Sequence, residues 1–460
     1  MNNLKQMDYF FNPKSIAIIG ASRSSTKVGH VVLRNFIEGK FPGRIFPINP
    51  KTKTLFDMKV YPSVLSVKDK IDLAIITVPA AFVSKVLEEC GKKRIPSVII
   101  ISAGFKEIGN DSEEEKLKKI LKKYRMRCIG VNCLGVYDPY SEVDTFFLPR
   151  YKLRRPDSGV IAFISQSGAL GSVVMDWMGT KGYKISKFVS YGNATDVDEA
   201  DLINYLGSDK KTKVICAYFE GIKNGRKFFE VAKKVSKKKP IIALKGGKTK
   251  EGGHSAASHT GSLAGSTEVV NAAFKQSGII NTDCIEQIFD FARVLSTQPK
   301  PKGNRVQIIT DGGGFGVMAT DWVIKSGLKL AKMEKKNLEK IRKISPPYVV
   351  LKNPIDLTGD TDAERYKVAI DAAIADKNVD MIALIVLFQV PRLSADMVDI
   401  ISEACRNSKK PIIVISAGGG YVEVLKKSLE ENNVPCFSYP GDAINAMKAL
   451  YDYSKNSENK

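Results

Sequence analysis

The sequence predicts an α/β protein built from three doubly wound domains, each with a mostly parallel sheet covered by helices on both faces. Three observations predict this class. The chain has 460 residues, which is too long for one ordinary hydrophobic core. Short apolar runs recur along it, each followed by a small or glycine-containing turn and then by a helical pattern. Two polar, proline-bearing segments, 151–159 and 296–304, divide these runs into three groups.

The apolar runs are rich in Val and Ile and are read as buried strands. In chain order the predicted strands are 15–22, 44–50, 72–79, 97–104 and 128–135, then 159–168, 187–193, 214–221 and 240–247, then 305–314, 381–389, 411–420 and 434–441. Such strands, bounded by helices, are typical of parallel sheets that are buried on both faces. Ligands of these sheets bind at the carboxyl ends of the strands, so chemistry is expected in the turns that follow them.

Composition narrows the class of protein. The formal net charge is +22, but the lysines fall in short helical stretches, which favours solvated helix faces over an acidic partner surface or nucleic acid. The seven cysteines form no CxxC pair, and three histidines make a structural zinc site improbable. No apolar stretch is long enough to span a bilayer, and the N-terminus lacks the layout of a signal peptide. We expect a cytoplasmic protein that binds neither membrane nor nucleic acid and holds no metal ion of its own.

The first strand–turn–helix, residues 16–30, points to a nucleotide. Its glycines do not follow the GxGxxG spacing, and Asn49 and Lys51 stand where a dinucleotide-binding strand usually ends in a carboxylate, so NAD is disfavoured. Lys51, with Lys27 and Arg23, suits a ligand with an extra phosphate on the ribose, as both coenzyme A and NADP have. A purely structural tight turn is the alternative.

Two of the three histidines, His254 and His259, lie five positions apart in the Gly/Ala/Ser-rich run 251–266. Imidazole suits phosphate transfer because it is nucleophilic and neutral near pH 7. An anion cradle at a helix start is offered by ISQSGALGS, 164–172, and Glu220 at a strand end could orient the imidazole. The alternatives are a surface or satisfied core histidine, as we expect for His30 on the first-domain helix, and a helix-capping role for Glu220. We therefore expect a phosphate carrier.

Five segments carry a family resemblance. In this order, ISQSGALGS, SYGNATDVDEADLINYL, YFEGIKNGRKF, ASHTGSLAGS and NPIDLTGD resemble the α subunit of ADP-forming acyl-CoA (acetyl-CoA) synthetases, relatives of succinyl-CoA synthetase. The resemblance runs over essentially the whole chain. It implies a Rossmann-like CoA-binding domain at 1–150, a phosphohistidine-bearing CoA-ligase domain at 151–300 and a second CoA-ligase-like interface domain at 301–460. The last two are expected to be flavodoxin-like.

The resemblance also implies a reaction. Acyl-CoA, ADP and phosphate would give the carboxylic acid, CoA and ATP through an acyl phosphate and a phosphohistidine. An ATP-grasp β subunit would pass the phosphoryl group to ADP and bind most of the ATP or ADP and Mg²⁺, in an α2β2 heterotetramer. No ATP-grasp segment is expected within the three domains, so the chain should not make ATP alone.

The residues that the resemblance implies fall into three sets. His259 would carry the phosphoryl group and Glu220 would orient it, with His254 as an auxiliary or incidental group. The phosphate-binding residues would be Ser165, Gln166, Ser167, Gly168, Thr260 and Gly261. The CoA-binding residues would be Gly20, Ser22, Lys27, Gly29, Lys51, Val78, Pro79, Ser102, Gly104 and Asn132. The lead-in GKTKEGGHS replaces the usual alanine-rich one, which leaves the roles of Lys248 and His254 open.

Other features leave alternatives open. Asp311 and Asp356 in the third domain could contact the site or only cap helices. The three-glycine turn 312–314 lacks a following GK[ST] and is not a P-loop. A CoA-binding regulatory protein without turnover is a second hypothesis. An NADP-linked oxidoreductase is a third, against which the missing GxGxxG and the histidine loop count.

Overall fold

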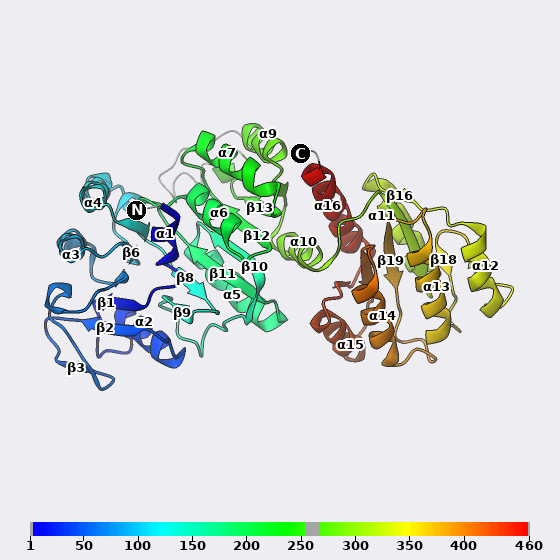
Figure 1. The fold of residues 1–460 in the computed structure, drawn as a ribbon, viewed down its shortest axis with the longest axis horizontal. Helices are drawn as coiled ribbons and strands as arrows, with labels where there is room; N and C mark the ends of the chain where they lie inside the picture. The colour runs from blue at the N-terminus through cyan, green and yellow to red at the C-terminus, as the bar shows by residue number, and fades with distance from the viewer. Residues whose placement is uncertain (1–2, 250, 254–266, 459–460) are drawn as a thin grey trace. The chain divides into compact units, whose positions relative to one another are not determined.

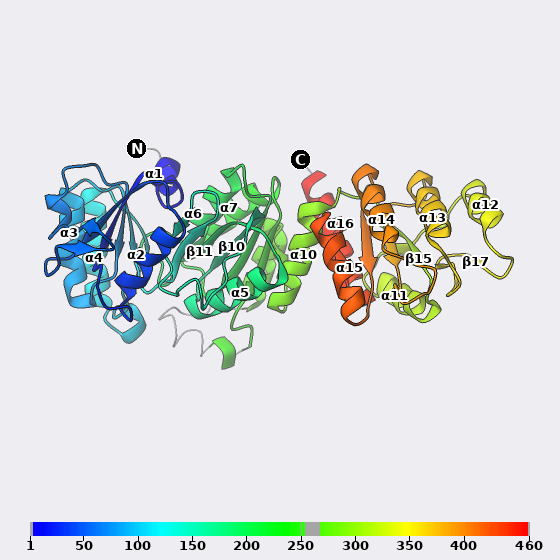
Figure 2. The same ribbon diagram turned by 90° about the horizontal axis from the view of Figure 1, so that it is seen from below.

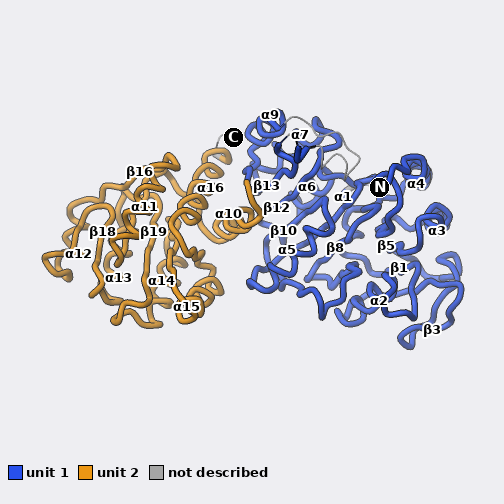
Figure 3. Tube along the Cα trace, turned by 180° about the vertical axis from the view of Figure 1, so that it is seen from behind, with its two compact units in different colours: residues 1–282 blue, residues 283–460 orange. Residues whose placement is uncertain are grey.

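The computed structural model describes residues 3–249, 251–253 and 267–458 (Figure 1). They form two compact units, Met1–Thr282 and Asp283–Lys460 (Figure 3). The first unit contains two large sheets and a two-stranded hairpin, the second unit contains one large sheet, and in each large sheet most strand pairs are parallel. The predicted α/β class with three doubly wound sheets is confirmed.

The first sheet has the order β2-β1-β5-β6-β7 and is parallel throughout. Its strands are β1 (Ser15–Ile19), β2 (Arg44–Ile48), β5 (Leu73–Ile76), β6 (Ser97–Ile100) and β7 (Arg127–Gly130). The helices and short elements around it are α1 (Asn3–Asp8), α2 (Val28–Glu38), α3 (Ala80–Lys92), α4 (Asp111–Tyr124), η1 (Val64–Ser66), η2 (Lys106–Ile108) and the hairpin β3 (Thr54–Leu55) with β4 (Met58–Lys59).

Both faces of this sheet are buried, which explains its continuous apolar strands. Along β1, Ile16 and Ile18 pack in one core cluster with α2, whereas Ala17 and Ile19 pack in another with α3 and α4. The chain order of the strands reverses between β1 and β5, and such a switch point is where open α/β sheets bind ligands.

The second sheet has the order β14-β13-β12-β10-β11-β8-β9. Its strands are β8 (Gly135–Asp138), β9 (Val143–Asp144), β10 (Ser158–Ser165), β11 (Ile185–Ser190), β12 (Val214–Phe219), β13 (Ile241–Lys245) and β14 (Ile280–Asn281). Its helices are α5 (Gly168–Lys181), α6 (Glu199–Ser208), α7 (Gly225–Ser236) and α9 (Thr267–Ser277). Helix α5 covers one face of the sheet, and α6 and α7 cover the other (Figure 2).

The predicted strand 128–135 is instead two strands in two sheets. β7 ends at Gly130 in the first sheet, and β8 begins at Gly135 and pairs antiparallel with β11 of the second. Gly130 and Asn132 have positive φ values, 103° and 53°, which break an extended run between them. One hydrophobic cluster extends from the first sheet to the second, for example from Ile129 to Ala162, so the two sheets share a core.

The second unit holds a sheet of order β17-β18-β15-β19-β20-β21, with β16 beside β15. Its strands are β15 (Arg305–Thr310), β16 (Lys329–Leu330), β17 (Val350–Leu351), β18 (Ile355–Asp356), β19 (Met381–Ile385), β20 (Ile412–Ile415) and β21 (Cys436–Phe437). Its helices are α10 (Ile285–Thr297), α11 (Gly313–Lys325), α12 (Lys335–Ile344), α13 (Ala363–Ala375), α14 (Asp396–Asn407), α15 (Gly420–Glu431) and α16 (Pro440–Glu458). No helix of the described ranges in either unit is both long and apolar enough to cross a membrane.

Candidate active site

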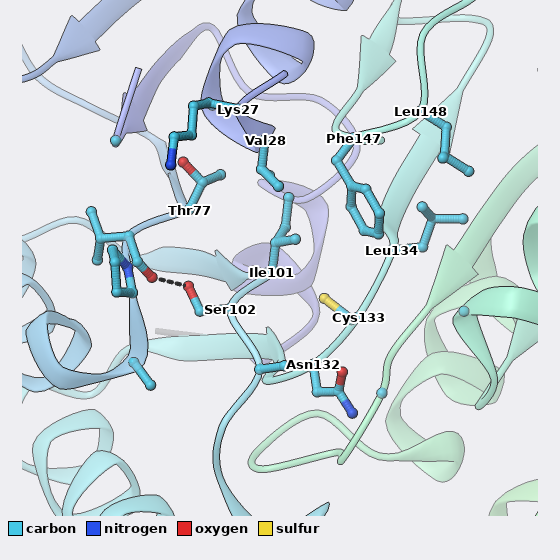
Figure 4. A pocket seen from close by; sticks show the side chains of 18 of the residues that line it. Lys27, Val28, Thr77, Ile101, Ser102, Asn132, Cys133, Leu134, Phe147 and Leu148 are labelled. Carbon is cyan, nitrogen blue, oxygen red and sulfur yellow. Dashed lines mark hydrogen bonds between the residues drawn. The ribbon is translucent and has the colours of Figure 1, made fainter. Parts of the chain in front are cut away.

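A cavity of about 1060 Å³ opens in the first unit at the carboxyl ends of strands from both of its sheets (Figure 4). Thirteen of the predicted site residues line it: Gly20, Ser22, Lys27, Gly29, Lys51, Val78, Pro79, Ser102, Asn132, Gln166, Ser167, Gly168 and Glu220. Residues predicted to bind a nucleotide and residues predicted to bind phosphate therefore meet in one space. His254, His259, Thr260 and Gly261 lie outside the described residues.

The turn after β1 brings the start of α2 very close to the sheet. A Cβ atom on Gly29 would lie 2.1 Å from the carbonyl oxygen of Gly20, so only glycine allows this approach. Gly20 itself has φ 99°, in the left-handed region that glycine tolerates. The close approach places Lys27, directly before α2, at the rim of the cavity (Figure 4).

The turn after β2 is tied to the turn after β1 by Asn49. Its Nδ2 donates to the carbonyl oxygen of Ala21 at 2.6 Å, and its Oδ1 accepts from the backbone amide of Lys51 at 2.8 Å. Lys27 and Lys51 thus reach the cavity from neighbouring strand ends and supply two positive charges there. This arrangement suits a phosphorylated ligand.

The turns after β5 and β6 form the next part of the wall. Ser102 Oγ donates to the carbonyl oxygen of Val78 at 2.5 Å (Figure 4), and Thr77 Oγ1 donates to the carbonyl oxygen of Ile19 at 2.9 Å. Gly104 is not among the lining residues. Its backbone amide donates to Glu107 Oε1 at 2.5 Å, so it shapes the loop beside the cavity.

The start of α5 forms the opposite wall. Ser167 caps this helix, because its Oγ accepts from the amide of Leu170 at 3.3 Å. Gly168 and Ala169 line the cavity, and the first amides of a helix have no carbonyl partner within it. The positive end of the helix dipole therefore faces the cavity, as an anion site requires. Ser165 is buried behind this turn and donates from Oγ to the carbonyl oxygen of Ser167 at 2.7 Å.

Glu220 follows β12 and is linked to the α5 turn by Gln166. Gln166 Oε1 accepts from the backbone amides of Glu220 and Gly221 at 2.7 Å and 2.9 Å. The pKa of Tyr218 is raised to about 12 by its burial, and further by the charge of Glu220 and a hydrogen bond to it. Burial lowers the pKa of Lys245, and the negative charge of Glu220 opposes that shift. Glu220 is thus an anchored carboxylate at the cavity surface.

Sequence reasoning missed several lining residues in the loops that follow β7, β9 and β11. Asn193 is one: its Nδ2 donates to Glu107 Oε2 at 2.6 Å and to Glu114 Oε2 at 3.1 Å. Four more are apolar, namely Cys133, Leu134, Phe147 and Leu148. The apolar run FFLP at 146–149, outside any predicted strand, was the signal that could have found two of them.

Two more predicted residues have local roles in the second unit. Asp311 accepts from the amide of Leu387 through Oδ1 and Oδ2, at 3.1 Å and 3.0 Å, and burial raises its pKa to about 6. Asp356 Oδ1 accepts from the amide of Thr358 at 2.9 Å.

Within the described part of the chain, no group of three or more His, Cys, Asp or Glu side chains could hold a metal ion.

Three family models match the chain. A CoA binding domain matches residues 14–139, a succinyl-CoA ligase like flavodoxin domain matches 158–295, and a Ligase-CoA domain matches 306–459. Each of the three sheets falls largely within one of these matches.

Curated relatives match over nearly the whole chain. Two from Pyrococcus furiosus, acetate–CoA ligase [ADP-forming] II subunit alpha and I subunit alpha, are 42% and 43% identical, with 98% of each chain covered. An acetate–CoA ligase [ADP-forming] from Methanocaldococcus jannaschii is 42% identical; the match covers 98% of this chain and 63% of that one.

Solved structures agree with these relatives. The dinucleotide forming acetyl-coenzyme A synthetase 1 of Ca. Korarchaeum cryptofilum, in complex with phosphate and ADP, matches with a TM-score of 0.92 at 38% identity, covering 98% of this chain and 97% of that one. PH0766 from Pyrococcus horikoshii matches with a TM-score of 0.88 at 39% identity, covering 98% and 99%.

Proposed function

The chain belongs to the family of ADP-forming acetate–CoA ligase α subunits, and from this premise we propose that it converts acyl-CoA, ADP and phosphate reversibly to a carboxylic acid, CoA and ATP. The observation that carries the proposal is one cavity of about 1060 Å³. It joins a wall suited to a phosphorylated nucleotide to the start of α5 and to Glu220. The family membership sets aside the NADP-linked oxidoreductase and the regulatory protein without turnover.

The lining residues fit coenzyme A as a substrate. Because Gly29 packs closely against Gly20, the backbone of this turn can contact a phosphate group directly, and Lys27 and Lys51 supply positive charge. The cavity is slightly larger than the ~300–1,000 Å³ usual for small-molecule sites, as a long ligand needs. We propose that the nucleotide lies along the ends of β1 and β2 and that the thiol end passes Ser102 toward Asn132.

The first chemical step is proposed at the start of α5. A phosphate oxygen attacks the thioester carbonyl carbon, the carbon–sulfur bond breaks, and CoA leaves as a thiolate that takes up a proton. The amides at Gly168 and Ala169 bind the phosphate, and because they are held by the helix they need no reorganisation during the step. The product is an acyl phosphate.

The second step is proposed for His259, whose role rests on the family resemblance. One imidazole nitrogen attacks the phosphorus of the acyl phosphate, the phosphorus–oxygen bond breaks, and the carboxylate leaves. Glu220, anchored by Gln166, would orient the other ring nitrogen and stabilise its charge. Thr260 and Gly261 would add to the phosphate site, with His254 beside it. Transfer of the phosphoryl group to ADP regenerates the imidazole.

The remaining components come from the family. We propose an ATP-grasp β subunit as partner, in an α2β2 assembly, with ADP and Mg²⁺ bound mainly by that subunit. The name "subunit alpha" of the Pyrococcus furiosus relatives and the ADP and phosphate of the Korarchaeum complex support this. Residues 1–150, 151–300 and 301–460 are proposed as the CoA-binding, phosphohistidine-bearing and interface domains. The free cysteines suit a reducing, cytoplasmic location.

Phosphorylation of the chain tests the function. The chain with an ATP-grasp partner is incubated with ATP and Mg²⁺, and an acid-labile, base-stable phosphate is sought by intact mass. We expect one phosphate in the wild type and in His254→Ala and none in His259→Ala. Loss in His254→Ala alone would move the carrier to that residue, and no phosphate in the wild type would contradict the proposal.

A further inference from the structure

One end of the cavity is apolar and is not explained by CoA or phosphate. Leu134, Phe147 and Leu148 line it, with Cys133 beside them. Figure 4 shows Phe147 and Leu134 facing the cavity from one side, and Lys27 and Ser102 from another. Leu134 is 2% exposed, and Phe147 and Leu148 are half-buried. An apolar wall opposite the charged one offers a place for the part of a substrate that carries no charge.

This wall adjoins the place where the thioester would react. A Cβ atom on Gly168 would lie 3.7 Å from Cβ of Leu134, so Leu134 lies against the start of α5. The amide of Leu134 donates to Ser190 Oγ at 3.2 Å, which fixes it there. If phosphate is bound at Gly168 and the thiol of CoA arrives past Ser102, the acyl group must extend from the thioester toward Leu134.

The wall is held rigidly by its backbone. Asn35 of α2, fully buried, donates from Nδ2 to the carbonyl oxygens of Phe146 and Leu148 at 2.7 Å and 3.2 Å. Arg155 donates to the same Leu148 carbonyl at 2.8 Å and is itself paired with Asp144 at 2.9 Å. The side chains of Phe147 and Leu148 therefore project from a fixed loop, so the size of the wall is set by the residues themselves.

The wall also carries no charge. Burial raises the pKa of Cys133 to about 12, so its thiol is neutral. Among the described residues that line the cavity, the cationic ones are Lys27 and Lys51, both at the nucleotide wall. A second carboxylate on the acyl group would be desolvated here without a positive partner, which is costly.

We propose that Leu134, Phe147 and Leu148 form the acyl pocket, that it takes short uncharged acyl groups of monocarboxylic acids, and that Phe147 sets their upper size. The inference rests on the proposed function and adds to that function the residues that select the acid.

Arsenolysis tests the pocket without the nucleotide half of the reaction. Arsenate replaces phosphate, attacks the thioester carbon and releases CoA, and the acyl arsenate then hydrolyses to the acid and arsenate. Loss of thioester absorbance is followed for acetyl-, isobutyryl-, phenylacetyl- and succinyl-CoA, with the chain alone and with its ATP-grasp partner. We expect acetyl-CoA to be used best by the wild type and succinyl-CoA worst.

Phe147→Ala should raise the phenylacetyl to acetyl ratio of kcat/KM by about ten-fold or more, since pocket size changes of this kind act on that scale. Phe147→Leu should give an intermediate ratio, and this variant replaces Phe147→Ala in the test if the alanine variant folds poorly. Tyr151→Ala, at a 71% exposed aromatic, is the control and should leave the ratio unchanged.

The outcomes separate the two levels of proposal. An unchanged ratio in a Phe147 variant that still binds CoA by calorimetry and still turns over would overturn the acyl pocket alone. No thiol release from any acyl-CoA by the wild type, with or without the partner, would overturn the proposed function and the pocket with it.

Discussion

Gln166 Oε1 lies 2.7 Å from the backbone nitrogen of Glu220 and accepts its hydrogen. A second bond from Gly221 reaches the same oxygen at 2.9 Å, so one side chain joins the turn after β10 to the turn after β12. The helix start proposed to bind phosphate and the carboxylate proposed to orient the imidazole are thereby held in one geometry.

Gln166→Ala should break the link between the start of α5 and Glu220. It leaves two backbone amides without their acceptor, and we expect the free energy of unfolding to fall by about 2 kcal/mol. Misplacement of Glu220 should slow phosphohistidine formation by about ten- to hundred-fold. Chemical denaturation and a time course of phosphate incorporation check both.

The control for this change is Gln389→Ala in the second unit, where an exposed glutamine donates to the carbonyl oxygen of Ala417 at 2.8 Å. It should alter neither quantity measurably. Wild-type rates of phosphorylation in Gln166→Ala would show that the link from Gln166 does not position Glu220.

The site could be predicted from sequence wherever it follows directly from strand ends. Lys27, Lys51 and Glu220 lie in the connections that follow buried apolar runs, and parallel strands bring their carboxyl ends to one edge. Leu134 and Phe147 could not be predicted in this way. The chain passes from the first sheet to the second between β7 and β8, where Gly130 and Asn132 have positive φ values that local apolar patterning does not register, and Phe147 follows β9 of the second sheet.

Lys51→Ala should weaken CoA binding by about ten-fold, the effect of losing one charge-assisted phosphate contact. If the contact is to the ribose phosphate, dephospho-CoA should bind wild type and variant equally. Calorimetric titration of both ligands measures this. Lys53→Ala removes an exposed lysine two residues away that does not line the cavity, and should bind CoA as the wild type does. Equal loss for both ligands would place Lys51 at a different phosphate.

Asp311 should make the second unit less stable as pH rises. Burial raises its pKa from 3.8 to about 6, so between these values the folded chain holds a proton that the unfolded chain releases. Stability contributed by the neutral form is full below about pH 4 and is lost as pH rises through about 6. Asp311→Asn should remove this loss and stabilise the chain near pH 7 by about 3 kcal/mol at most.

Denaturation of wild type and Asp311→Asn at several values between pH 4 and pH 7 checks the sign as well as the size. The control is Asp321→Asn on α11, an exposed carboxylate. A difference between wild type and Asp311→Asn that does not grow with pH would contradict the assignment.

Gly29→Ala should lower both the stability of the fold and the affinity for CoA, because the added methyl group would clash with its neighbours. Its Cβ would lie 2.1 Å from the carbonyl oxygen of Gly20 and 2.8 Å from Thr77 Oγ1, and the first of these is backbone. Helix α2 must then move away from the turn after β1, carrying Lys27 with it. We expect a loss of about 2–3 kcal/mol in the free energy of unfolding, as overpacking commonly produces, and CoA affinity reduced by more than Lys51→Ala reduces it.

The matched control is Gly314→Ala, in the first turn of α11 after the corresponding strand of the second unit, where a Cβ would meet no atom within 4 Å. There alanine should be neutral or slightly stabilising, since it favours the helix over the unfolded chain. Thermal unfolding and CoA titration of the two variants measure the change in stability and in CoA affinity. If Gly29→Ala behaves like Gly314→Ala, the close approach of α2 to the sheet does not form the CoA wall, and the nucleotide must be held elsewhere in the cavity.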